Sequence, residues 1–168
     1  MNFKGFIFSF IFCVNVIYAQ DSKKITEKFF PDFDLDVPTP AFNNKKGFTK
    51  YEELITFLDN LQKKNPYVFK YKFIGESQKG RKIPMVLMGN EDNEKPRVCY
   101  MGGLHGNEPA STEGLLFFMY NLLNEDSLTT LLEDVNLSII PMANIDGYEI
   151  QDRYAANGQD LNRDQTKL

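Results

Sequence analysis

Residues 97–109 read RVCYMGGLHGNEP, and this stretch passes from an apolar segment through a glycine-rich loop into the start of a helix. Arg97 to Met101 is short and apolar, which predicts an interior strand. Gly102 to Glu108 contains three glycines, which relax the backbone around the histidine of the loop. Pro109 then predicts a helix that continues to about Asn124, because the N–H that proline lacks has no partner in the first turn of a helix.

The segments that follow set the direction of the sheet. Residues 128–133 predict a short second helix, and the β-branched run at 135–141 predicts another strand. Two strands joined by a helical crossover are normally parallel, with a right-handed connection, so their carboxyl ends lie at one edge of the sheet. The loops that leave these ends, 102–108 and 142–163, therefore lie where open α/β sheets bind ligands.

Upstream, the sequence predicts one helix and a hairpin. Thr49 can cap a helix, with Glu52 three residues later, and apolar residues recur at helical spacing until Asn65. Residues 68–74 alternate apolar and polar side chains, and a turn at 75–81 leads to a second strand at 83–88. The two strands predict an antiparallel pair, so we expect an α/β domain with a mixed sheet.

The first nineteen residues differ from the rest. Lys4 precedes an apolar run from Gly5 to Ile17, which predicts a secretory signal peptide over residues 1–19. An uncleaved membrane anchor is the alternative, although the run is short for about 30 Å of hydrocarbon. We therefore expect a secreted or periplasmic protein with no stable membrane span after signal cleavage. Residues 20–48, punctuated by prolines, predict a polar leader that lies on the surface or is disordered, which leaves 49–168 as the domain.

The charge balance argues against a nucleic-acid partner. Lys and Arg total 19 against 23 for Asp and Glu, for a net charge of -4, and the cations form no basic stripe. After signal cleavage Cys99 is the one cysteine left, so no internal disulfide can form. The oligomeric state is left open.

The loop after the first interior strand holds the single histidine of the sequence. His105 and Glu108 are three residues apart at the junction of a strand end and a helix start, a spacing that lets an imidazole and a carboxylate face one metal ion. A glutamate at this spacing also arises by chance in about one case in sixteen, so the pair alone is a weak signal.

The second loop carries two arginines among Asn and Asp residues. Arg163 can bind a carboxylate through its planar fork, and Arg153 can stabilise a developing oxyanion. The alternative is a solvated surface on which Asp152, Asp160 and Asp164 pair with these arginines.

Three motifs in order resemble a known family. GGLHGNE at 102–108, NIDGY at 144–148 and DLNR at 160–163 are similar to motifs of the zinc metallocarboxypeptidases of the carboxypeptidase A/E type. The resemblance runs from about Thr49 to Leu168. It implies a three-layer α/β/α fold with a mixed, partly parallel sheet of the phosphorylase/hydrolase-like kind, present here as an incomplete half.

The resemblance also implies roles for individual residues. His105 and Glu108 match two of the three zinc ligands of the family. Arg153 matches the arginine that polarises the scissile carbonyl, and Asn162 and Arg163 match the pair that binds the terminal carboxylate of the substrate. The implied cofactor is Zn, which would activate water, and the implied partner is a peptide or protein C-terminus.

The departures from the family motifs concern the rest of its site. The resemblance implies a second histidine as third zinc ligand and a later glutamate as general base, and these 168 residues offer a counterpart to neither. We therefore expect the amino-terminal half of a longer enzyme, inactive by itself and binding zinc weakly.

Two other functions stay open. A desuccinylase/aspartoacylase-like zinc acylase has a similar histidine loop and Asp-x-Asn-Arg stretch, although the Arg153–Asn162 spacing looks longer here and the predicted signal peptide argues for export. A non-catalytic module that binds C-terminal carboxylates would keep Asn162 and Arg163 without hydrolysis.

Overall fold

The structure, a computed structural model, describes residues 28, 37–45, 47–90 and 94–163. The chain divides into two compact units, Met1–Asp36 and Val37–Leu168, and the description below concerns the second. The predicted signal peptide and the first part of the predicted leader lie outside the described residues. Within the described ranges, no helix has both the length and the apolar character needed to cross a membrane.

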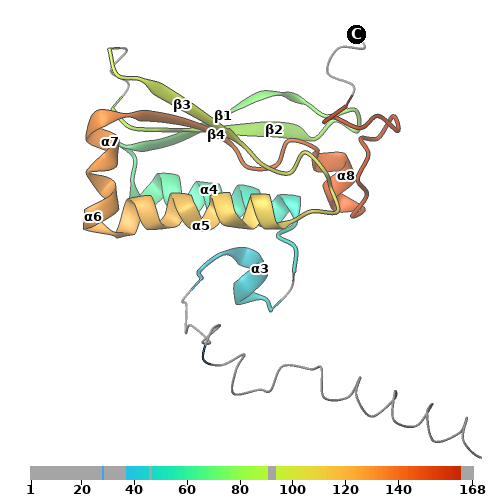
Figure 1. Cartoon of the computed structure of the whole chain (residues 1–168), viewed down its shortest axis with the longest axis horizontal. Helices are drawn as coiled ribbons and strands as arrows, with labels where there is room; N and C mark the ends of the chain where they lie inside the picture. Colours follow the sequence, from blue (N-terminus) through green and yellow to red (C-terminus); the bar gives the residue numbers. More distant parts are fainter. Residues whose placement is uncertain (1–27, 29–36, 46, 91–93, 164–168) are drawn as a thin grey trace, which may run out of the picture. The chain divides into compact units, whose positions relative to one another are not determined.

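The centre of this unit is a four-stranded mixed sheet in the order β1-β2-β4-β3 (Figure 1). Its strands are β1 (Phe69–Glu76), β2 (Lys82–Met88), β3 (Arg97–Met101) and β4 (Asn136–Ile140). β2 is antiparallel to both β1 and β4, which confirms the predicted hairpin. β3 and β4 are parallel, as the helical crossover between them predicts.

Two long helices, α4 (Tyr51–Lys64) and α5 (Ala110–Asn124), cover one face of the sheet (Figure 1). Each presents leucines or methionine at helical spacing to side chains of the sheet, which removes them from water. The centre of this core consists of Leu54, Leu58, Leu61, Phe69, Val86, Leu116, Met119, Leu122 and Ile139. The α/β class with a mixed sheet is therefore confirmed, and the described residues supply the sheet and one helical layer of the expected fold.

The interior position predicted for β3 is wrong for the described sheet, in which β3 is an edge strand. All five of its residues are exposed, including Val98, Tyr100 and Met101. An apolar run shows which side chains a strand carries, but not whether a neighbouring strand covers its edge. The other edge strand, β1, carries Lys70 and Lys72 and a bulge, features that discourage edge-to-edge pairing.

The crossover from β3 to β4 contains more than the one short helix predicted after α5. Helices α6 (Asp126–Thr129) and α7 (Leu131–Asp134) share the stretch predicted as one. At the carboxyl ends of the strands, pairing continues into the loops, since the N–H of Ala143 donates to Gly102 O and that of Asn144 to Gly103 O. The two loops are thus held side by side, as predicted.

The segment before α4 is bound to the domain more closely than a surface leader would be. It contains the short helix α3 (Pro40–Asn43), and both Thr39 and Ala41 are buried. The prediction that Thr49 caps α4 is wrong. The Thr49 N–H and hydroxyl donate instead to the buried Glu113 carboxylate (2.9 Å each), which also accepts from the Thr39 hydroxyl. A buried carboxylate attracts such donors more strongly than a helix terminus does.

Candidate functional site

The lack of apolar periodicity in the second loop predicts a structureless segment, but the structure shows otherwise. The loop contains α8 (Ile145–Glu149), whose N-cap Asn144 accepts a hydrogen bond from the N–H of Gly147. A five-residue helix is too short for periodicity to reveal, but Asn is a strong N-cap residue and three residues later Gly147 supplies the N–H. Tyr148 packs into the core and its hydroxyl donates to Glu113 (3.4 Å).

Asp146 of α8 fixes the turn between β1 and β2. Its carboxylate accepts from Arg81 Nη1 (2.7 Å), the Ser77 hydroxyl (2.9 Å) and the Lys79 N–H (3.0 Å). Burial raises the pKa of this carboxyl, but these hydrogen bonds and the charge of Arg81 outweigh burial and hold the pKa below its usual value. Asp146 is therefore ionised at neutral pH and ties α8 to the hairpin.

A contact between two glycines joins the histidine loop to α8. A Cβ atom at Gly106 would lie within 3.0 Å of the C and O atoms of Gly147 and the O atom of Asp152. All three are backbone atoms, so Gly106 is required here for close approach rather than for an unusual φ. This close approach holds the residue next to His105 against α8.

His105 is nearly buried, and each of its ring nitrogens faces a carboxylate. Nδ1 lies 3.2 Å from Glu108 Oε1, and Nε2 lies 3.1 Å from Asp160 Oδ1. When Nε2–H donates to Asp160, the lone pair of a neutral ring lies on Nδ1, on the Glu108 side. The arrangement therefore directs one nitrogen and one oxygen to the same space.

Arg153 completes the group from the other loop. Its Nε donates to Asp160 Oδ2 (3.0 Å) and its Nη1 to Glu108 Oε1 (3.3 Å). Burial raises the pKa of the Asp160 carboxyl, but hydrogen bonds from the Asn162 N–H, Arg153 and His105 hold it below its usual value. The pairing of Arg153 with Asp160 was part of the alternative in which this loop is merely a solvated surface; Asp164 of that alternative lies outside the described residues.

Asn162 and Arg163 are exposed and follow Asp160 directly. The N–H of Asn162 donates to Asp160 Oδ1 (2.9 Å), and Arg163 Nη1 donates to the Asn162 carbonyl (3.1 Å). The structure therefore places His105 and Arg153 against the same Glu108 oxygen, and joins Asn162 and Arg163 to this group through Asp160.

The His105–Glu108 pair fits a zinc ion in its donor types and spacing. Zinc takes imidazole nitrogen and carboxylate oxygen at about 2.0–2.2 Å, so two ligands of a tetrahedral ion lie about 3.3 Å apart. The 3.2 Å between Nδ1 and Oε1 agrees with this edge. Asp160 contacts the opposite ring nitrogen, and among the described residues no three His, Cys, Asp or Glu side chains form a metal-binding group.

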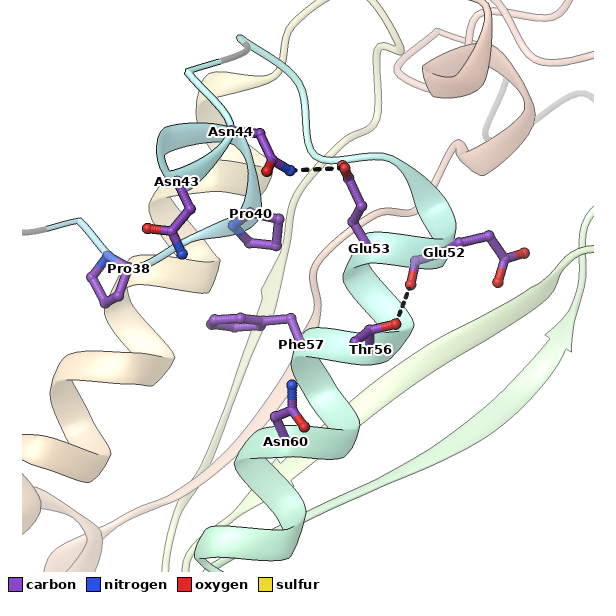
Figure 2. Close-up of a pocket in the computed structure, with 9 residues that line it drawn as sticks. All are labelled: Pro38, Pro40, Asn43, Asn44, Glu52, Glu53, Thr56, Phe57 and Asn60. Carbon is purple, nitrogen blue, oxygen red and sulfur yellow. Dashed lines mark hydrogen bonds between the residues drawn. The ribbon is translucent and has the colours of Figure 1, made fainter.

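A separate cavity of about 390 Å³ lies between α3 and α4 (Figure 2). Phe57, Asn43 and Asn60 line it together with two prolines, and Glu53 at its rim accepts from the Asn44 amide (3.0 Å). None of its lining residues belongs to the group around His105. The cavity is a product of the way residues 37–45 lie against α4.

Comparison with known proteins identifies the family. The sequence model described as zinc carboxypeptidase matches residues 54–167. The chain belongs to the zinc carboxypeptidase family. The family assignment made from the three motifs is thereby confirmed.

Carboxypeptidases of two different organisms are similar to this chain. It is 34% identical over 140 residues to carboxypeptidase 2 of Trichophyton tonsurans, covering 79% of this chain and 26% of that protein. It is 29% identical over 139 residues to carboxypeptidase SOL1 of Arabidopsis thaliana, covering 79% and 28%. The chain therefore spans about a quarter of the length of these curated relatives.

The fold agrees with that of a solved carboxypeptidase. The crystal structure of carboxypeptidase A from Helicoverpa armigera superposes with a TM-score of 0.60 at 26% identity, covering 64% of this chain and 29% of that chain. The sheet and helices described above are thus part of the carboxypeptidase fold.

The sequence does not predict the structural roles of three carboxylates. The sequence predicts Asp160 only as a partner of the arginines, although this residue lies two positions before Asn162 in the DLNR motif. Asp146 likewise lies inside a quoted motif. Glu113 gives no signal beyond being the one charged residue of α5, which is itself a reason to look for buried partners.

Proposed function

We propose that this chain forms part of the active site of an exported zinc metallocarboxypeptidase that releases amino acids from peptide or protein C-termini. The observation that carries the proposal is the placement of His105 Nδ1 beside Glu108 Oε1. Asp160 holds the ring through its other nitrogen, Nε2. His105 and Glu108 are the two zinc ligands implied by the family motif, and their spacing suits that ion.

Each loop residue then has a task that follows from its chemistry. Zinc, when bound with an open position, supplies an activated water and polarises the substrate carbonyl. Arg153, whose guanidinium lies beside Glu108, adds positive charge where a tetrahedral oxyanion develops. Asn162 and Arg163 stand exposed next to it and bind the terminal carboxylate of the substrate through a planar fork and an amide.

The 168 residues contain one histidine, so they supply two of the three protein ligands that the family motif implies. We propose that these residues alone bind zinc weakly and do not hydrolyse peptides. A third ligand and a general base have to be supplied in addition for catalysis.

Carboxylate recognition can be tested without catalysis. We expect the chain to bind a short peptide with a free C-terminal carboxylate and to bind its C-terminally amidated counterpart much more weakly, as measured by NMR titration. Arg163→Gln is expected to abolish the difference, whereas Arg97→Gln, which removes the same charge from β3, is expected to preserve it.

Equal binding of the free and amidated peptides would contradict the proposed role of Arg163. Loss of the difference in both variants would mean that net charge, rather than a carboxylate site, produces it. Binding of the free peptide without zinc affinity at His105 would favour a non-catalytic carboxylate-binding module.

A further inference from the structure

Four side chains at the candidate zinc site form a closed ring of contacts. His105 Nδ1 and Arg153 Nη1 approach the same oxygen, Oε1 of Glu108, at 3.2 and 3.3 Å. The other two contacts run through Asp160, whose Oδ1 faces His105 Nε2 (3.1 Å) and whose Oδ2 accepts from Arg153 Nε (3.0 Å). A positive charge therefore already touches the carboxylate oxygen that a metal ion would take.

The two contacts of Arg153 differ in how easily they can be given up. The Glu108 side chain is 59% exposed, so water can replace the guanidinium there at little loss. The Asp160 side chain is only 14% exposed and accepts two other hydrogen bonds, so the Nε contact is the firmer one. Arg153 can therefore release Glu108 by rotating its guanidinium while Nε stays on Asp160.

We propose that the Arg153 guanidinium neutralises Glu108 when no metal ion is bound. It releases Glu108 when a divalent cation of the zinc type enters the site. Arg153 thereby lowers the metal affinity of the site, and metal loading frees Nη1 to face the substrate carbonyl. The inference rests on the proposed function, because it requires His105 and Glu108 to be metal ligands.

The expected size follows from Coulomb's law. A unit charge about 5 Å from a divalent cation in a solvated site changes its affinity about tenfold. Arg153→Gln is therefore expected to bind zinc about tenfold more tightly than the parent chain. Arg153→Lys, which keeps the charge, is expected to stay near the parent affinity.

The experiment measures zinc dissociation constants by chelator competition for the chain and its variants, with zinc alone as the probe. Arg97→Gln is the matched control, because it removes one positive charge near the amino end of β3 while His105 follows its carboxyl end. His105→Ala tests the site itself and is expected to abolish binding.

The outcomes separate the inference from the proposed function. Tighter binding by Arg153→Gln with an unchanged Arg97→Gln supports the inference. Equal or weaker binding by Arg153→Gln overturns it and leaves the zinc site standing, provided that His105→Ala abolishes binding. Zinc binding that survives His105→Ala, or its absence from the parent chain and Arg153→Gln alike, overturns both.

Discussion

Replacement of Gly106 by alanine tests the contact that holds the two site loops together. The added methyl would meet the C and O atoms of Gly147 and the O atom of Asp152, all within 3.0 Å, where ordinary contacts begin at 3.4 Å. Neither segment can turn aside as a flexible side chain can, because Gly147 lies inside α8 and its O atom accepts from the Asp152 N–H.

The matched control is Gly114→Ala. Gly114 lies within α5, and a Cβ atom there would meet nothing within 4 Å. Alanine at this position is expected to stabilise the chain by roughly 0.5–1 kcal/mol through helix propensity. At Gly106 we expect a loss of about 3 kcal/mol, at the upper end of the cost of overpacking. The equilibrium constant for folding would then fall about a hundredfold.

Urea unfolding followed by far-ultraviolet circular dichroism measures both variants. Because the chain contains no tryptophan, tyrosine fluorescence is the second probe of the same transition. If Gly106→Ala and Gly114→Ala unfolded at the same urea concentration, the close approach of the two loops would be wrong, and with it the placement of His105.

Two further predictions concern buried carboxylates. Because its hydrogen bonds lower the pKa of Asp146, they stabilise the fold above the unfolded value of about 3.9, and this stability is lost as the pH falls through the folded value. Asp146→Asn is therefore expected to destabilise the fold by about 2 kcal/mol at neutral pH and by less below about pH 4. Asp134→Asn, at an exposed position, is the control in urea unfolding. A loss of stability that does not depend on pH would contradict this prediction. Glu113→Gln is expected to speed hydrogen exchange at the Thr49 amide, whereas Glu133→Gln on the surface is expected to leave it unchanged, and equal protection in both would refute the anchoring role.

The sequence was sufficient to predict features that depend on local pattern. Alternation and apolar runs located the four strands, and the crossover rule gave the parallel pair and the adjacency of the two loops. The motifs brought His105, Glu108 and Arg153 to one place, where the structure puts them in contact.

Features that depend on distant partners could not be predicted. Thr49 has the chemistry of a helix cap, but the choice between the helix terminus and Glu113 depends on a residue sixty-four positions away. The exposure of β3 depends on which strands stand beside it, and α8 is too short for any periodicity. In the first two cases a tertiary contact that the local pattern does not contain decided the outcome, and in the third the element was too short to produce a pattern.

Helix α8 also constrains the order of events as the chain is synthesised. Residues along it secure three segments that are made earlier: Asp146 binds the turn at Ser77, Tyr148 binds Glu113, and Glu149 accepts from the N–H at the start of α4. From residue 77 to residue 149 is 72 residues, about 4 to 14 s of translation at about 5–20 residues per second. For that interval the turn at Ser77 lacks its contact with Asp146, whereas α5, which ends at Asn124, waits a shorter time, so the position of one five-residue helix sets when each segment gains this anchor.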